Sequence, residues 1–213
     1  LASAYVQDTI RVTPTLTVDL GVRVDWSRML TGAAQLIPRL GAAYYIPASD
    51  TRLRASFGRF FQPPQPENLL LASSEEARAL SPFEDENGGG GALEPERQTG
   101  VEVGISQSLM RRLRLDVSYW HRRVHHAGDP NVFFGTTIIF PNVVARGRAS
   151  GVDVRLEIPR REGWSGYVSY SNSHVAQFGP ITGGLFLEDE VIEIGPGTRF
   201  TPDHDQRHVG AFG

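Results

Sequence analysis

The stretch Thr15-Leu-Thr-Val-Asp-Leu-Gly-Val-Arg-Val-Asp-Trp26 decides the fold of this 213-residue chain. Apolar side chains occupy every second position from Leu16 to Trp26, and polar residues or glycine occupy the positions between them. A period of two predicts a β-strand with one apolar and one polar face. The pattern recurs, strongly or weakly, at residues 6–12, 40–46, 53–61, 101–109, 113–119, 152–158 and 164–170, with a last fragment from Arg207. We therefore predict an all-β chain with about nine strands of roughly 9–12 residues.

The composition fits one folded domain and excludes several functional classes. With 40% hydrophobic and 21% charged residues, the chain differs from a disordered tail, and its 23 glycines and 14 prolines argue against an all-helical bundle. All 21 basic residues are arginines and are balanced by 24 acidic residues, so no basic face for nucleic acid is indicated. The absence of cysteine excludes a disulfide framework, a thiolate nucleophile and cysteine-ligated zinc. No apolar run approaches the roughly 18 residues of a membrane-spanning helix.

The connections between the predicted strands alternate between short and long. The short ones are residues 13–15, 47–50, 110–112 and 160–163, and the long ones are residues 27–36, 63–95, 125–142 and 173–205. Outer-membrane β-barrels show this asymmetry, with short periplasmic turns and long external loops. Strands of about 9–11 residues also suffice to cross the hydrocarbon layer when tilted. The pattern favours an antiparallel up-and-down transmembrane β-barrel wall with long external loops, and a soluble β-sandwich is the alternative.

The alternation also predicts which face of the sheet meets which environment. In a barrel wall, the apolar face is convex and contacts lipid, and the charged face is concave and lines a wet lumen. We assign Leu16, Val18, Leu20, Val22, Val152, Val154 and Leu156 to the convex face, and Asp19, Arg23, Asp153 and Arg155 to the concave face. Aromatic residues near strand ends are candidates for interfacial girdles, with ordinary core packing as the alternative: Trp26, Tyr44, Tyr45, Phe60, Phe61, Tyr119, Trp120 and Trp164.

Six short motifs follow one another along the chain: Tyr5-Val-Gln-Asp-Thr-Ile-Arg-Val-Thr-Pro14 with the strand after it, Pro38-Arg-Leu-Gly-Ala-Ala-Tyr44, Ala55-Ser-Phe-Gly-Arg59, Leu93-Glu-Pro-Glu-Arg97, Ala149-Ser-Gly-Val-Asp153 and Pro202-Asp-His-Asp-Gln-Arg-His208. In this order, the series resembles the C-terminal barrel of TonB-dependent outer-membrane receptors. Within that family, it is most similar to the branch with a carboxypeptidase-regulatory-like N-terminal domain. The resemblance implies a barrel of about 22 strands. Residues 1–213 would be part of that barrel domain, with the plug domain absent from them.

The resemblance implies a function, a location and partners. The expected function is energised uptake of a scarce substrate, namely a siderophore, a vitamin, a metal complex or an oligosaccharide, in the outer membrane of a Gram-negative-type bacterium. The expected partners are outer-membrane lipid, the plug domain of the same protein, the TonB energy-coupling complex and an unidentified small-molecule or oligosaccharide ligand. No nucleic acid partner and no cofactor are expected. A non-transporting outer-membrane binding or adhesion barrel and a soluble β-sandwich binding module are the alternatives.

Candidate ligand-binding residues lie in the long loops: Asn68, Glu75, Glu76, Asp189 and Glu190. No enzyme is predicted, because no Ser/His/Asp or paired-carboxylate grouping is supported beyond composition. No metal site is predicted either, although His204 and His208, with Asp203 or Asp205, come nearest to one; a structural role is expected for them. Alternation further predicts that His174 and His208, on neighbouring strands, point to opposite faces of the sheet.

Overall fold

The computed structural model describes residues 2–26, 34–63, 95–110, 112–132, 139–161, 163–183, 194–202 and 205–213. These residues form ten β-strands in one antiparallel sheet. The strands are β1 (Ala2–Arg11), β2 (Leu16–Trp26), β3 (Ala34–Ile46), β4 (Thr51–Gln62), β5 (Glu96–Leu109), β6 (Leu113–Val132), β7 (Ile139–Arg161), β8 (Trp164–Gly183), β9 (Arg199–Phe200) and β10 (His208–Phe212). Among the described residues, no helix has the length and hydropathy needed to span a membrane.

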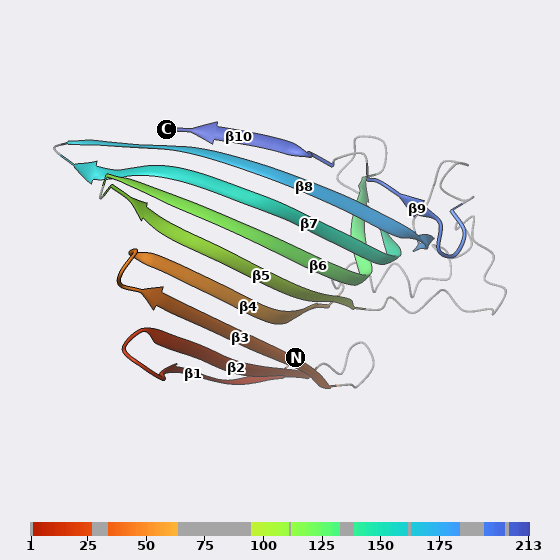
Figure 1. Ribbon diagram of the computed structural model, residues 1–213. Helices are drawn as coiled ribbons and strands as arrows, with labels where there is room; N and C mark the ends of the chain where they lie inside the picture. The colour runs from red at the N-terminus through yellow and green to blue at the C-terminus, as the bar shows by residue number, and fades with distance from the viewer. Residues whose placement is uncertain are drawn as a thin grey trace.

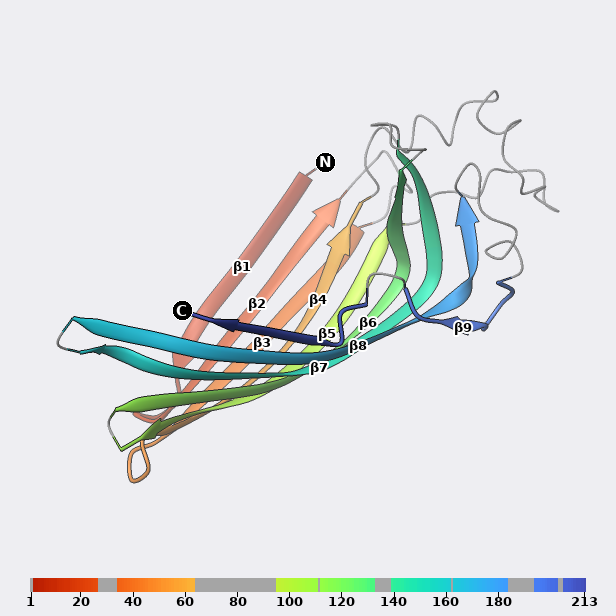
Figure 2. The same cartoon turned by 90° about the horizontal axis from the view of Figure 1, so that it is seen from above.

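The strands follow one another across the sheet in chain order, from β1 at one edge through β8 to β10 at the other. Figure 1 shows them side by side, and Figure 2 shows that the sheet is strongly curved. The short strand β9 pairs with β8 on the same side as β10. The sheet does not close on itself in these residues, because β1 and β10 each pair with one neighbour only. The predicted all-β, up-and-down antiparallel arrangement is confirmed.

The short connections all lie at one end of the sheet (Figure 1). In the first of them, Val12 N–H donates to the carbonyl oxygen of Leu16 at 3.0 Å, and the Leu16 N–H donates to the hydroxyl of Thr13 at 3.0 Å. Asp50 in the second turn and Met110 in the third adopt positive φ angles of 50° and 52°, as tight reversals often require. The sequence therefore predicted the position of these turns correctly.

Three strands are about twice as long as predicted. β6 and β8 have 20 residues each and β7 has 23, whereas the sequence suggested roughly 9–12. Residues 125–132, 139–142, 173–183 and 199–200, predicted as loop, are therefore strand. The antiparallel ladder continues through pairs such as Ala127↔Val144 and Val143↔Thr182, although side-chain alternation has faded there. Backbone hydrogen bonds stabilise these extended parts of the strands, and the alternation of apolar and polar side chains gives no information about backbone hydrogen bonds.

The two faces of the sheet differ in polarity and in burial. Directly opposed residues of antiparallel strands point to the same face, so the register Leu20↔Leu40↔Phe57↔Val101 defines an apolar face. Its side chains are exposed, with 47% of Leu40, 54% of Val103 and 60% of Val168 accessible. The polar residues Asp25, Ser106 and Ser118, on the other face, are buried.

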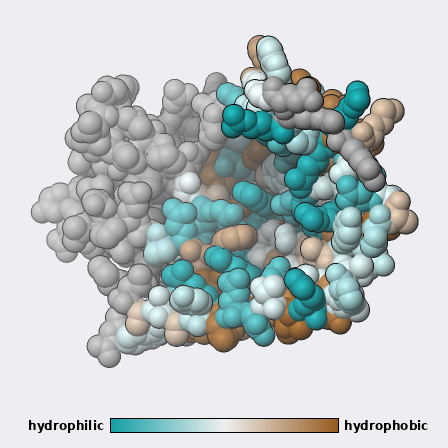
Figure 3. All heavy atoms as spheres, turned by 90° about the vertical axis from the view of Figure 1, so that its left-hand side faces the viewer, coloured by the Kyte–Doolittle hydropathy of each residue, from teal (hydrophilic) through white to brown (hydrophobic). Residues whose placement is uncertain are grey.

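This pattern is the reverse of a soluble protein, in which apolar side chains gather inside. Among the described residues, the buried hydrophobic side chains are only Ile37, Val144 and Ala176. Seen from the end that carries the short turns, hydrophilic residues gather in the hollow of the sheet (Figure 3). Side chains on the concave face of a curved sheet converge and cover one another, which explains why the polar face is the more buried one. The register therefore gives the face assignment predicted from the sequence.

Candidate functional site: the polar wall of the hollow

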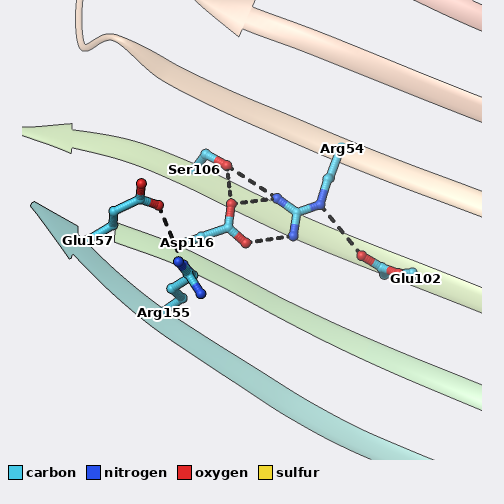
Figure 4. A network of polar contacts seen from close by, with 6 residues as sticks. All are labelled: Arg54, Glu102, Ser106, Asp116, Arg155 and Glu157. Carbon is cyan, nitrogen blue, oxygen red and sulfur yellow. Dashed lines mark hydrogen bonds and ion pairs between the residues drawn. The ribbon is translucent and has the colours of Figure 1, made fainter. Parts of the chain in front are cut away.

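The concave face carries a network of charged side chains from three neighbouring strands (Figure 4). Arg54 on β4 reaches across β5 to Asp116 on β6, with Nη1–Oδ2 and Nη2–Oδ1 distances of 2.8 and 2.7 Å. The Ser106 hydroxyl on β5 donates to Asp116 and accepts a hydrogen bond from Arg54 Nη1 at 3.2 Å. Glu102 lies 3.5 Å from Arg54 Nε. Arg54 is thereby held between two carboxylates, in the two-point geometry that guanidinium groups favour.

Glycines on the concave face make room for the large side chains of their neighbours. A Cβ atom at Gly104, which pairs with Arg54, would lie 2.6 Å from Arg54 Cζ. At Gly151, which pairs with Trp120, a Cβ atom would lie 2.7 Å from Trp120 Cζ2 and 2.8 Å from the backbone oxygen of Asn172. Glycine at these positions lets Arg54 and Trp120 lie flat along the wall, and at Gly151 the nearby backbone oxygen makes glycine the residue that fits.

Further polar pairs extend this wall beyond the network. Arg155 Nε lies 3.4 Å from Glu157 Oε2 on β7, and Arg23 Nε lies 2.7 Å from Asp25 Oδ1 on β2. The Arg155 guanidinium also sits 4.0 Å from the centre of the Tyr167 ring on β8. Positive and negative groups are interspersed rather than segregated. The described part of the concave face is therefore a polar surface of mixed sign.

The aromatic residues proposed for interfacial girdles divide between the two faces. The register places Tyr44, Phe61 and Tyr119 on the apolar face, but Tyr45 and Trp120 on the polar face. The Tyr45 hydroxyl donates to Asp50 Oδ1 at 2.9 Å, and Arg52 packs 5.7 Å from the centre of its ring. Phe60 also lies on the polar face, 5.7 Å below the guanidinium of Arg39. For these three residues, the girdle interpretation was wrong.

A small open pocket lies at the short-turn end of the wall. It is lined by Tyr45, Asp50, Arg52, Ser106, Gln107, Ser108 and Arg114. The Gln107 amide donates to the Ser49 carbonyl at 2.6 Å and thereby joins the second turn to β5. The polar groups that line the pocket are largely hydrogen-bonded to one another or to the turn, so we assign this pocket to the packing of the turns.

The predicted loop sites fall outside the described residues. Asn68, Glu75, Glu76, Asp189 and Glu190 are all in this group, and their role in ligand binding stays a prediction. His204 lies outside the described residues as well. The described residues contain no group of three or more side chains placed to hold a metal ion.

The orientation predicted for His208 was wrong. His208 pairs with Asn172 on β8, and Tyr170 and His174 share the face of Asn172, so His174 and His208 point to the same, apolar face. The Tyr170 hydroxyl lies 2.7 Å from His208 Nδ1, and the two rings are stacked with centroids 6.1 Å apart. The apolar residue Val209, next to His208, suggests the opposite phase when sequence alone is considered. Backbone pairing instead turns Val209 toward the polar face, opposite Ser171.

Comparison with known proteins identifies the family that builds such a wall. The family model for TonB dependent receptor-like β-barrels matches residues 1–204. The chain belongs to this family of TonB-dependent receptor barrels. No curated protein sequence matches the chain significantly.

Solved structures of two receptors and a copper transporter share the fold. The siderophore receptor PirA from Pseudomonas aeruginosa superposes with a TM-score of 0.59 at 17% identity, over 82% of this chain and 35% of PirA. The copper transporter OprC gives a TM-score of 0.57 at 16% identity, over 81% of this chain and 28% of OprC. The pyoverdine outer membrane receptor FpvA from P. aeruginosa PAO1, bound to pyoverdine, gives 0.55 at 17% identity, over 84% of this chain and 26% of FpvA.

This chain therefore spans about a third or less of the length of these structures. The identities support a shared fold, and they do not transfer a substrate. TonB-dependent receptor barrels are outer-membrane proteins of Gram-negative bacteria, and the family consists of transporters rather than enzymes. The implied branch with a carboxypeptidase-regulatory-like domain stays a prediction.

Proposed function

We propose that this chain forms part of the wall of an outer-membrane TonB-dependent receptor that takes up a scarce substrate. The observation that carries the proposal is the reversed polarity of the sheet, with exposed apolar residues such as Val103 and Val168 outside and buried Ser106 and Ser118 inside. Water on both sides would penalise the exposed apolar face, whereas lipid on the outer side and water in the lumen satisfy both faces. The same observation argues against the soluble β-sandwich module.

The long strands give the wall a second role. At about 3.3 Å per residue, the 23-residue β7 extends about 75 Å, whereas about 10 tilted residues cross the hydrocarbon core. β6, β7 and β8 therefore project well beyond the membrane on the side of the long loops. In our proposal they raise these loops into the medium, where the loop residues, including Asn68, Glu75, Glu76, Asp189 and Glu190, capture the ligand.

The transport step involves parts of the protein outside these residues. We propose that a plug domain of the same protein fills the lumen, that the TonB complex pulls on the plug and that the substrate then passes along the concave wall. The mixed-sign wall around Arg54 and Asp116 supports this role, because neighbouring charges satisfy one another and leave a hydrated path without a strong trap for one ion. The ligand is a siderophore, a vitamin, a metal complex or an oligosaccharide.

Uptake in cells tests this proposal. Strains with and without the full-length gene are compared for outer-membrane localisation and for uptake of radiolabelled ferric siderophores, cobalamin, copper and maltooligosaccharides. We expect the protein in the outer-membrane fraction and uptake of one probe class that disappears when the tonB gene is deleted. Outer-membrane localisation with probe binding but no TonB-dependent uptake would instead support the non-transporting binding barrel. A protein recovered only in the soluble fraction would contradict both barrel hypotheses.

A further inference from the structure

Two rows of basic residues cross the outer face of the sheet on the side of the long loops. The pairing registers of β4 to β8 place them in line on the face that carries the apolar residues. The first row runs Arg59↔Thr99↔Arg123↔Arg148, and the second runs Phe61↔Arg97↔His125↔Arg146↔Phe178↔Arg199. We call the six arginines of these rows the basic belt: Arg59, Arg97, Arg123, Arg146, Arg148 and Arg199.

The belt follows directly on the apolar part of each strand. On β7, successive outward positions are Ile158, Leu156, Val154, Val152, Ser150, Arg148 and Arg146. On β6, they are Leu113, Leu115, Val117, Tyr119, His121, Arg123 and His125. The change from apolar to basic therefore occurs at the same register level on these two paired strands. Such a change is expected where a hydrocarbon layer ends and lipid headgroups begin.

The guanidinium groups of the belt are exposed. None of the carboxylates whose side chains the structure describes forms an ion pair with these six arginines. Arg123 and Arg148 are directly opposed across β6 and β7, an arrangement in which like charges repel. The nearby acidic residues Glu96 and Glu102 have the parity of the concave face. An external anion between the opposed arginines would remove this repulsion.

Two arginines of the belt contact side chains of β8. The Arg148 guanidinium lies 4.7 Å from the centre of the Phe178 ring, and Arg199 Nη2 lies 2.8 Å from His174 Nε2. Aromatic rings beside basic side chains are typical of the boundary between hydrocarbon and headgroups. Arginine also binds phosphate oxygens through its planar fork, which distinguishes it from a simple point charge.

We propose that the basic belt binds the phosphate groups of lipids in the leaflet that surrounds the loop end of the barrel. The proposal rests on the membrane-spanning role proposed above, because only a lipid-embedded sheet presents the belt to headgroups. Phosphates anchored in a membrane surface lie just beyond the hydrocarbon layer, and the arginines of β4, β5, β6, β7 and β9 lie beyond the apolar part of the sheet on its loop side. Each arginine near an anionic surface adds to the attraction, so the belt would hold a shell of phosphorylated lipid around the wall.

Lipid binding by the purified full-length protein tests this inference. The folded protein is titrated in neutral detergent with bisphosphorylated lipid A and with its dephosphorylated form, and bound lipid is counted by native mass spectrometry. The belt variant is Arg59→Gln, Arg123→Gln and Arg148→Gln. The matched control removes three charges from the concave face, by Arg39→Gln, Arg114→Gln and Arg122→Gln. Inorganic phosphate is added as a competitor, to separate headgroup binding from capture of a free anion.

We expect the wild type and the control to prefer bisphosphorylated lipid A equally, and the belt variant to bind it at least about tenfold more weakly. Equal binding by the belt variant, an equal loss in the control, or full competition by inorganic phosphate at millimolar concentration would overturn the proposal. Heat-modifiable mobility on gels verifies the barrel fold of each variant. If the triple variant does not fold, Arg123→Gln and Arg148→Lys are compared singly, with a loss expected for both. A wild type that never inserts into lipid would contradict the proposed function itself.

Discussion

Arg54 and Asp116 are joined by two hydrogen bonds of 2.8 and 2.7 Å that cross the strand lying between them. The bridge is possible because the intervening strand presents Gly104 directly beside Arg54 and leaves space for the guanidinium. It ties three strands together on the concave face, where backbone hydrogen bonds link only adjacent strands. Side-chain hydrogen bonds therefore link the strands of the wall in addition to their backbone hydrogen bonds.

Removing this bridge should weaken the barrel measurably. We expect Asp116→Asn to lower the free energy of unfolding by about 1–2 kcal/mol, because Arg54 loses a charged, two-point partner at a half-exposed site. Urea unfolding of the full-length protein in lipid vesicles measures the change. The more exposed Arg155–Glu157 pair supplies the control, and Glu157→Gln should change the free energy by less than about 0.5 kcal/mol. Equal effects of the two substitutions would contradict a special role for the bridge.

The close contact of Trp120 with Gly151 predicts a strong effect of one methyl group. Gly151→Ala should destabilise the folded protein by about 1–3 kcal/mol, because the new Cβ would lie 2.8 Å from the backbone oxygen of Asn172, which cannot move aside freely. Gly21→Ala is the matched control, since its nearest neighbour would be a side-chain atom of Gln7 at 3.6 Å. Unfolding midpoints in denaturant measure both variants. A Gly151→Ala protein as stable as the control would show that the wall relaxes more easily than its geometry indicates.

The parts of the fold that sequence predicts well are those with strict alternation. β2 and the turn-proximal halves of β5 to β7 alternate clearly, and their positions and faces were predicted correctly. The extensions of β6 to β8 were missed, because their alternation fades although the ladder continues. The two-residue β9 was missed because it is too short to show a period.

The side-chain network is harder to predict than the strands. The sequence indicates that Arg54 and Asp116 belong to charged faces, but their pairing depends on the registers of three strands at once. The orientation of His208 was wrong for the same reason, since one apolar neighbour at a sheet edge does not fix a register. The candidate ligand residues in the loops lie in segments without periodicity, where sequence gives only composition.

The polarity of the two faces predicts opposite responses to the same new charge. Val154→Arg, on the apolar face, should cost about 2–4 kcal/mol of folding free energy in a bilayer, because arginine near the midplane is poorly solvated by lipid. Ser171→Arg, on the polar face opposite Asp153, should cost less than about 1 kcal/mol. The folded fraction on unheated gels after refolding into vesicles measures both variants. Equal losses would mean that both faces meet the same environment.

The open edges predict the behaviour of this segment by itself. β1 and β10 each leave one row of backbone groups without a strand partner within the described sheet, and every residue of β1 is exposed. Such edges promote pairing with other chains, and the exposed apolar face adds to the tendency. Residues 1–213 expressed alone should aggregate or require denaturant. Size-exclusion chromatography and thermal melting would refute this if they gave a soluble monomer with one cooperative transition.

The most direct test of the account is the accessibility of alternate residues along β7. The 213 residues contain no cysteine, so single cysteines at positions 152 to 158 of the full-length protein can each carry a nitroxide spin label once any cysteine elsewhere has been replaced. In lipid vesicles, we predict that labels at Val152, Val154, Leu156 and Ile158 collide mainly with oxygen dissolved in lipid. Labels at Asp153, Arg155 and Glu157 should collide mainly with a water-soluble nickel chelate. An accessibility profile without this period of two, or with its phase reversed, would contradict a lipid-facing apolar side and a water-filled polar side.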